Sequence, residues 1–181
     1  MAEGAASDVC IGLGANLGDR LAALRDAVRS ILDLPGTTLI AASAVYETEA
    51  HVLPGGAPQP DHLNAVVRVA TVLAPLDLLT RLQAIERDAG RQPDVPAWSP
   101  RPLDLDLLLY DAQVLDTDEL VIPHPRIAAR RFVLAPLADV AADLVVAGTG
   151  RTVAALLDHT PDPARIERTA NGLVGKGLRK T

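Results

Sequence analysis

The stretch "RPLDLDLLLY" at residues 101–110 places two aspartates inside a run of leucines. If the stretch is a β-strand, side chains alternate between the two faces of a sheet, so Asp104 and Asp106 share one face about 7 Å apart at their Cα atoms. The other positions divide by parity: the opposite face takes Leu103, Leu105, Leu107 and Leu109, and the face of the aspartates takes Leu108 and Tyr110. Two carboxylates at this spacing repel each other unless a cation lies between them.

This carboxylate pair has two interpretations, a solvated strand edge or a metal site. Leu108 and Tyr110 continue the face of the aspartates, so the face is partly buried and uncompensated carboxylates there would be costly. Mg²⁺ in proteins takes one or two carboxylates together with substrate phosphates. We therefore favour Asp104 and Asp106 as magnesium ligands. The four histidines are scattered and there is one cysteine, so no zinc ligand set is apparent.

The composition predicts one globular domain. The chain has 181 residues, 49% of them hydrophobic, which argues against disorder. A net charge of −6 disfavours nonspecific binding of nucleic acid. We find no signal peptide and no apolar run of membrane-spanning length, and we expect a cytoplasmic monomer that does not associate with membranes. The expected core covers about residues 8–147, with a C-terminal extension over 148–181.

Hydrophobic periodicity predicts an α+β fold. The expected strands are 8–14, 39–49, 62–73 and the aspartate strand at 101–110, and the expected helices are 19–33 and 75–90. This β-α-β-β-α-β order is typical of the ferredoxin-like (split βαβ) antiparallel sheet, which has helices on one face. Loops rich in Pro and Gly occupy 50–61 and 91–101, a hairpin follows the last strand, and additional C-terminal elements include helices over 130–141 and 153–160.

Polar residues gather on the expected open face of this sheet. His62, Asn64 and Arg68 share one parity in their strand, as the aspartates do in theirs. Arg91 and Arg101 flank the loop that leads into the aspartates, where guanidinium groups would suit phosphate binding. Arg126 and Arg131 are better explained as surface residues.

Other catalytic classes have little support. "GLGANLGD" has Leu17 where a dinucleotide fingerprint needs its third glycine, and no acidic residue for ribose is evident. The chain lacks GxxxxGK[ST] and GxSxG, which excludes a P-loop and a serine-nucleophile elbow. Cys10 lies within a predicted strand, so no nucleophile is available.

Five motifs occur in order: "GLGANLGD", "QPDHLNAVV", "LQAIERDAGR", "WSPRPLDLDLLLY" and "IPHPRIAARRFVLAPL". With them the chain, from about Val9 to Val146, closely resembles the 6-hydroxymethyl-7,8-dihydropterin pyrophosphokinases of folate synthesis. The resemblance implies a ferredoxin-like fold and transfer of pyrophosphate from ATP to the pterin hydroxymethyl group, with release of AMP. It also implies two Mg²⁺ ions on Asp104 and Asp106.

The resemblance assigns further roles by position. Catalytic positions are Asp104, Asp106, Arg91 and Arg101, and pterin positions are Gly14, Thr48, Asn64, Trp98 and Phe132, whose two rings would enclose the pterin. ATP positions are Gln83, Glu86, Arg91, Arg101, Leu107, His124 and Arg130. The chain departs from the family pattern at His62, Pro93, Asp94 and Ala97. Two alternatives stay open: a non-catalytic pterin or nucleotide sensor, and a phosphotransferase with another acceptor.

Overall fold

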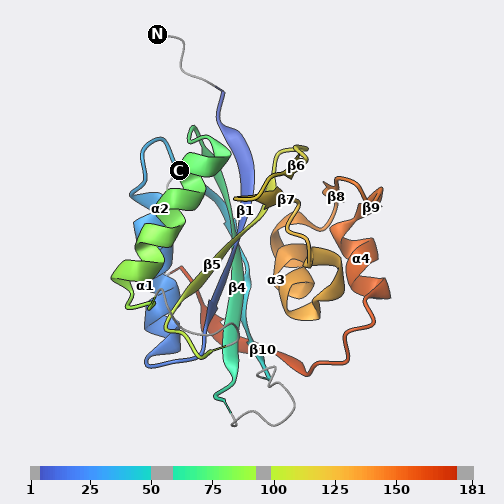
Figure 1. Ribbon diagram of the computed structural model, residues 1–181. Coiled ribbons are helices and arrows are strands. Elements are labelled where there is room, and N and C mark those ends of the chain that lie inside the picture. Colours follow the sequence, from blue (N-terminus) through green and yellow to red (C-terminus); the bar gives the residue numbers. More distant parts are fainter. Residues whose placement is uncertain (1–4, 50–58, 93–98, 175–181) are drawn as a thin grey trace.

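One antiparallel sheet lies between two layers of helices in the computed structural model of the protein (Figure 1). The structure describes residues 5–49, 59–92 and 99–174. None of the helices in these ranges has both the length and the apolar surface to cross a lipid bilayer.

The element order confirms the predicted ferredoxin-like arrangement. The first half of the chain contains β1 (Ser7–Ala15), α1 (Arg20–Leu32), β2 (Thr38–Ala42), β3 (Ala44–Thr48), β4 (His62–Thr71) and α2 (Pro75–Asp88). The second half contains β5 (Asp104–Tyr110), β6 (Leu115–Asp116), β7 (Val121–Ile122), the 3₁₀ turn η1 (Ile127–Ala129), α3 (Arg131–Ala141), β8 (Val145–Val146), β9 (Arg151–Thr152), α4 (Val153–His159) and β10 (Ile166–Gly172). The strand order in the main sheet is β10-β3-β4-β1-β5, with β2 also paired to β4.

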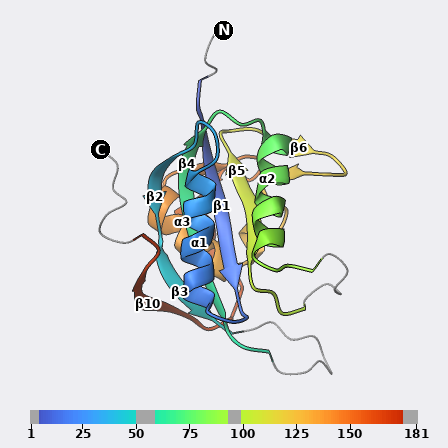
Figure 2. The same cartoon turned by 90° about the vertical axis from the view of Figure 1, so that its left-hand side faces the viewer.

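The first face of the sheet carries α1 and α2 (Figure 2). Helix α1 begins where the Asp19 side chain accepts a hydrogen bond from the backbone N–H of Ala22 at 3.0 Å, and α2 begins with Pro75, whose missing N–H costs nothing at a first helical position. The apolar stripes of both helices pack against alternate residues of β1, β4 and β5. Members of this cluster include Ile11, Leu13, Leu24, Ile31, Val67, Leu78, Leu82, Leu105 and Leu107.

The second face was expected to be free of helices, but α3 and α4 cover part of it (Figure 1). Their side chains form a second apolar cluster with Cys10, Val66, Leu108 and Leu109 of the sheet. The opposite end of this face, where β4 and β5 begin, carries polar side chains, among them His62, Asn64, Asp104 and Asp106. We call this group the polar strip. The second face therefore consists of a polar strip beside an apolar cluster.

The predicted strand over 39–49 is wrong as a continuous element, because it breaks at Ser43 into β2 and β3. The Ser43 N–H donates to the carbonyl oxygen of Val66 at 2.9 Å, and the Val66 N–H donates back to Ser43 Oγ at 2.9 Å. A side-chain oxygen thus replaces a carbonyl of the ladder, which lets the strand change direction without leaving a buried N–H unpaired.

The predicted faces of Leu109 and Tyr110 are also wrong. The pairing of β1 with β5 shifts register between Cys10 and Ile11, so that Leu109 faces Cys10 and Leu107 faces Ile11. The extra residue, Leu108, reverses the alternation after it. Leu109 therefore joins the second cluster, while Tyr110 joins the first and donates its hydroxyl to the carbonyl of Leu73 at 2.5 Å.

The C-terminal segment adds β10, a strand that the sequence pattern did not predict. It pairs antiparallel with β3, with Ile166 opposite Thr48, and so extends the main sheet by one edge strand. Leu173, just after the strand, is buried in the first cluster. The Arg25 guanidinium of α1 donates two hydrogen bonds to the carbonyl oxygen of Gly172, at 2.9 and 3.1 Å.

We expect Leu134→Ala to destabilise the protein by about 2–5 kcal/mol, because the Leu134 side chain is fully buried between α3 and the sheet. Leu76→Ala is the matched control: Leu76 is 45% exposed on α2, and its loss should change the free energy of unfolding by less than about 0.5 kcal/mol. Urea denaturation measures both. Equal values for the two variants would contradict a tightly packed second cluster.

Candidate functional site

The polar strip is assembled by the register of three adjacent strands. Gly14 of β1 lies opposite Asn64 of β4 on one side and opposite Asp104 of β5 on the other. A Cβ at Gly14 would lie 3.3 Å from Asn64 Oδ1 and 3.9 Å from the Asp104 Cβ. Because Gly14 has no side chain, a flat ligand could approach the backbone between the Asn64 amide and the Asp104 carboxylate.

Asn64 is fixed by a hydrogen bond to Thr48. Its Nδ2 donates to Thr48 Oγ1 at 2.7 Å, and both side chains are buried. This bond fixes the orientation of the amide, so Oδ1 is the atom on the side of Gly14. His62, opposite Thr48 in the β3–β4 pairing, lies on the same face, and burial lowers the pKa of its imidazole. Sequence parity predicted this grouping correctly.

Asp104 binds two arginines. Arg91 and Arg101 both donate to Asp104 Oδ1, at 2.8 and 3.0 Å. All three side chains are about one-quarter to one-third exposed, 32% for Arg91, 23% for Arg101 and 31% for Asp104. Each guanidinium has five N–H donors, more than these bonds use, so an anionic ligand could be bound at this cluster.

Glu86 is a buried residue that binds Arg91 of this cluster. Its carboxylate is 4% exposed, accepts the backbone N–H of Leu105 at 2.7 Å and forms an ion pair with Arg91. Burial raises the pKa of Glu86 to about 7, although the Leu105 N–H and Arg91 act in the opposite direction. Glu86 therefore connects α2, β5 and Arg91, and its place on the nucleotide side of the site stays a prediction.

Asp106 lies two residues after Asp104 in β5, opposite Gly12 of β1. Burial, followed by repulsion from Asp104, raises the pKa of Asp106 to about 6, while Arg130, Arg101 and Arg91 lower it. The His124 Nε2 is 4.0 Å from Asp106 Oδ1. A divalent cation at the two aspartates would remove the repulsion that raises this pKa.

His124 is a neutral imidazole at neutral pH. Burial and the nearby Arg130 and Arg126 lower the pKa of its imidazole to about 4. Its Nδ1 accepts the backbone N–H of Arg126 at 3.2 Å, so the single proton of the neutral ring is on Nε2, the nitrogen nearest Asp106. The tautomer is therefore set by the backbone of the following turn.

Arg130 and Phe132 form the border between the polar strip and the second cluster. The Arg130 guanidinium carbon lies 5.4 Å from the centre of the Phe132 ring, a cation–π contact. Burial and repulsion from Arg126 lower the pKa of Arg130, while Asp106 and Asp104 raise it. The phenyl ring packs against the second cluster and is partly exposed.

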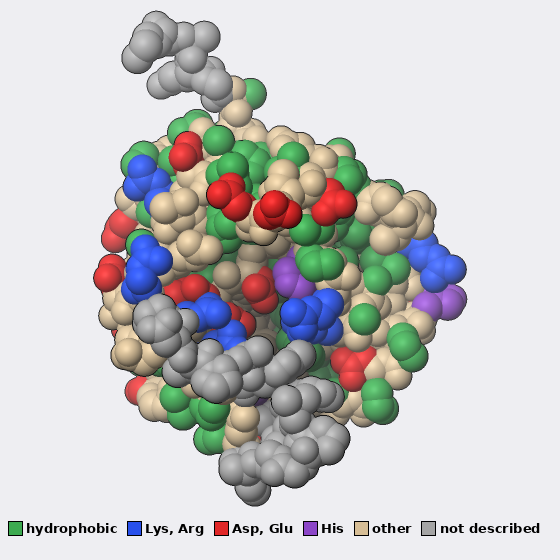
Figure 3. Space-filling view, viewed as in Figure 1, with side chains coloured by type: hydrophobic (Ala, Val, Ile, Leu, Met, Phe, Trp, Pro, Cys, Tyr) green, Lys and Arg blue, Asp and Glu red, His purple; other side chains and the backbone are tan. Residues whose placement is uncertain are grey.

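Figure 3 shows acidic, basic and histidine side chains together around a hollow between the two helix layers. Across the described ranges no group of three or more His, Cys, Asp or Glu residues could hold a metal ion by itself. Any ion at Asp104 and Asp106 would complete its shell with water and ligand oxygens, as Mg²⁺ does.

Two predicted positions lie apart from this cluster, and a third is outside the described residues. Leu107 is buried in the first cluster, so only its backbone could meet a nucleotide. Gln83 is exposed on α2, one turn before Glu86. Trp98, with the divergent Pro93, Asp94 and Ala97, lies outside the described residues, as do most of the two loops predicted at 50–61 and 91–101.

Asn16 was missed at the level of sequence, although it lies in the quoted "GLGANLGD". It is 1% exposed, and its Oδ1 accepts the backbone N–H of Arg101 at 2.8 Å. Its Nδ2 reaches Gln59 Oε1 and the carbonyl of Pro60, each at 3.5 Å. An asparagine directly after a predicted strand, in a glycine-rich turn, is the sequence signal that could have identified it.

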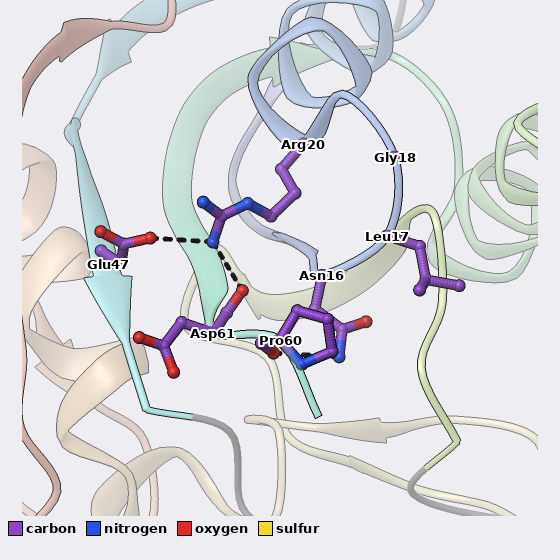
Figure 4. A pocket seen from close by; sticks show the side chains of 7 residues that line it. All are labelled: Asn16, Leu17, Gly18, Arg20, Glu47, Pro60 and Asp61. Atoms are coloured by element: carbon purple, nitrogen blue, oxygen red, sulfur yellow. Dashed lines mark hydrogen bonds and ion pairs between the residues drawn. The ribbon is translucent and has the colours of Figure 1, made fainter. Parts of the chain in front are cut away.

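Asn16 also lines a pocket of about 390 Å³ beside the start of α1 (Figure 4). There the Arg20 guanidinium bonds Glu47 Oε1 at 2.9 Å and the carbonyl of Asp61 at 2.6 Å. The remaining lining residues are Leu17, Gly18 and Pro60. The aspartate pair, the site arginines and His124 are not part of this pocket, so we place the site on the polar strip, where these groups converge.

Comparison with known proteins agrees with the geometry. The family model of 7,8-dihydro-6-hydroxymethylpterin-pyrophosphokinase matches residues 10–142. The chain is similar to the 2-amino-4-hydroxy-6-hydroxymethyldihydropteridine pyrophosphokinase of Pseudomonas aeruginosa, with 46% identity over 136 residues, 75% of this chain and 82% of the relative. The Bacillus subtilis protein of the same name is 42% identical over 130 residues, covering 72% of this chain and 75% of its own.

Longer proteins also match. A folate synthesis bifunctional protein of Arabidopsis thaliana is 44% identical over 133 residues, 73% of this chain but 26% of that protein. Among solved structures, a Plasmodium falciparum HPPK-DHPS matches with a TM-score of 0.67, at 16% identity, over 84% of this chain and 44% of that one. At this identity the structural likeness supports the fold.

The buried Glu86 predicts a pH dependence of stability. Because the folded state raises its pKa from 4.5 to about 7, the folded protein holds this proton more tightly, and the free energy of unfolding falls as pH rises through that window. Glu86→Gln keeps an acceptor for the Leu105 N–H but does not titrate. Relative to the unmodified protein, this variant should gain up to about 3 kcal/mol between pH 4.5 and pH 7.

Urea denaturation at several pH values measures that difference. Glu119→Gln, at an exposed position of the β6–β7 hairpin, is the matched control and should show no such gain. If the stability curves of Glu86→Gln and the unmodified protein ran parallel across the window, the raised pKa would be refuted.

Proposed function

Because the chain belongs to the 7,8-dihydro-6-hydroxymethylpterin-pyrophosphokinase family, we propose that it transfers pyrophosphate from ATP to 6-hydroxymethyl-7,8-dihydropterin. The products are the pterin diphosphate and AMP, and the reaction belongs to folate biosynthesis. The observation that carries the proposal is the pair Asp104 and Asp106 on one strand face, bordered by Arg91, Arg101, Arg130 and His124.

The residues present fit two magnesium ions. Asp104 and Asp106 supply oxygen ligands on neighbouring positions of one face, and the mutual repulsion that raises the pKa of Asp106 would be offset by divalent charge. Bound Mg²⁺ would supply charge neutralisation at the polyphosphate and polarisation of the attacking hydroxyl group. The protein has few carboxylates for each ion, which suits a site that shares its ions with substrate phosphates.

The arginines bind and orient the polyphosphate. Arg91 and Arg101 share one carboxylate oxygen of Asp104, so each has further N–H groups for phosphate oxygens. Asn16 holds the backbone of Arg101, and Glu86 holds Arg91. Transfer of a phosphoryl-type group depends on in-line positioning and charge stabilisation, so fixed guanidinium groups contribute directly to the rate.

The remaining nucleotide contacts come from His124, Arg130, Gln83 and the backbone near Leu107. His124 carries its proton on Nε2 and has a pKa of about 4, so at neutral pH it donates a hydrogen bond and is a poor general base. Arg130 adds a further cation near Asp106, since it lowers the pKa of that carboxyl. No further proton acceptor is needed if the acceptor hydroxyl is already polarised.

The pterin lies on the polar strip, against the backbone of Gly14. Asn64, held by Thr48, presents Oδ1 to ring N–H groups, and Phe132 offers a face for stacking. Trp98 is the second ring in this proposal. The acceptor is thereby oriented with its hydroxymethyl group toward Asp106.

We further propose that the protein works in the cytoplasm as a monomer, with small molecules as its only substrates and no nucleic acid or membrane partner. The net charge of −6 and the local arginine cluster favour anionic small molecules at this site over extended polyanions.

The test is AMP formation from ATP, Mg²⁺ and 6-hydroxymethyl-7,8-dihydropterin. Asp104→Asn and Asp106→Asn keep the side-chain shape, and each should lower turnover by roughly a thousandfold while the fold is retained. Asp118→Asn, on the exposed hairpin, should keep full activity. Far-ultraviolet circular dichroism checks folding.

Two results would contradict the proposal. Near-normal turnover in both site variants would exclude the dyad as the metal site. Absence of AMP with the unmodified protein, despite measurable binding of ATP or pterin, would favour a non-catalytic sensor or a different acceptor.

A further inference from the structure

Arg130 and Phe132 depend on a helix end that has no cap of its own. Arg130 occupies the residue before α3, with φ −124° and ψ 106°, and its side chain makes no capping bond. Its carbonyl accepts the N–H groups of Val133 and Leu134, at 3.1 and 3.0 Å. Because the first N–H groups of a helix have no intrahelical partner, the N–H of Arg131 needs an acceptor from elsewhere.

Asp162 supplies that acceptor from the C-terminal segment. Its Oδ2 accepts the Arg131 N–H at 2.9 Å, while its Oδ1 accepts the N–H of Ala164 at 3.0 Å. The carboxylate thus joins its own loop to the first turn of α3. A negative charge at this position also interacts favourably with the helix dipole.

The loop that carries Asp162 is constrained in three ways. Pro161 and Pro163 flank the aspartate and fix two backbone torsions. On one side of the loop, α4 packs on α3 through the second cluster, and on the other side β10 pairs with β3. Figure 1 shows this connection running from α4, beneath α3, to β10 at the sheet edge. The carboxylate is therefore pre-organised for its bond.

We propose that Asp162 is a positioning residue for the pyrophosphate transfer, acting through Arg130 and Phe132. The inference rests on the proposed function, since it assigns these two residues to the nucleotide and pterin sides of the site. Asp162 lies outside residues 10–142 that match the family model. A segment beyond the family match thus orders the part of the site that borders the second cluster.

The first experiment measures the cap without reference to catalysis. Amide hydrogen exchange of residues 131–134 is compared in the full-length protein and in Asp162→Ala, Asp162→Asn and Asp158→Ala. Loss of a cap should speed exchange in this turn roughly fivefold in Asp162→Ala. Asparagine is also a good cap, so Asp162→Asn should restore protection, and Asp158→Ala, at an exposed position of α4, should change nothing.

The second experiment measures the effect on the site. Asp162→Ala should raise KM for ATP and for the pterin roughly fivefold. Asp162→Asn should restore both KM values, and Asp158→Ala should leave them unchanged. In an Arg130→Ala background, the additional effect of Asp162→Ala on KM for ATP should shrink toward onefold, because the residue acts through Arg130.

The outcomes separate the two levels of the proposal. Unchanged exchange at residues 131–134 in Asp162→Ala, or changed exchange with unchanged KM values, would overturn the positioning role. An unmodified protein that forms no AMP would refute the proposed function, and the role of Asp162 in the reaction with it, while the exchange data would still report on the helix cap.

Discussion

The antiparallel register of β4, β1 and β5 is the constraint on which the rest of the site depends. It places Gly14 between Asn64 and Asp104, and Gly12 opposite Asp106, so an amide, a glycine floor and two carboxylates share one face. A slip of one residue would turn every one of these groups toward α1 and α2 and move leucines to the ligand side. The apolar cluster on the first face thus specifies the position of the polar groups on the second.

The register places Asp104 and Asp106 on one face, but the charged groups around the two carboxylates differ. Asp104 accepts hydrogen bonds from Arg91 and Arg101, whereas burial and repulsion from Asp104 raise the pKa of Asp106 despite the opposing effect of Arg130, Arg101 and Arg91. The two carboxylates therefore differ in environment although they lie on the same strand. Asp104 is already oriented by cations, and Asp106 is the one whose charge is stabilised most by an added positive ion.

The sequence predicted the parts of the structure that follow from local periodicity. Alternation placed Asn64 and His62 on the face of Asp104 and Asp106, and helical spacing gave α1 and α2 within one or two residues. The errors lie where a tertiary contact overrides the period. Ser43 inserts its hydroxyl into the ladder, and the extra residue Leu108 reverses the faces of Leu109 and Tyr110. The bonds of Asn16 and Asp162 join segments distant in the chain, which periodicity alone cannot reveal.

The added strand β10 has a consequence beyond the site. An uncovered sheet edge offers unpaired backbone groups as a template for another chain, and β10 occupies that edge along β3. Glu167 and Arg168 are exposed on β10, which is the outermost strand at this edge. Charged side chains on an outermost strand discourage further strand addition. Strand β10 thus protects the β3 edge of the sheet from pairing with another chain, a protection that a variant without β10 would lack.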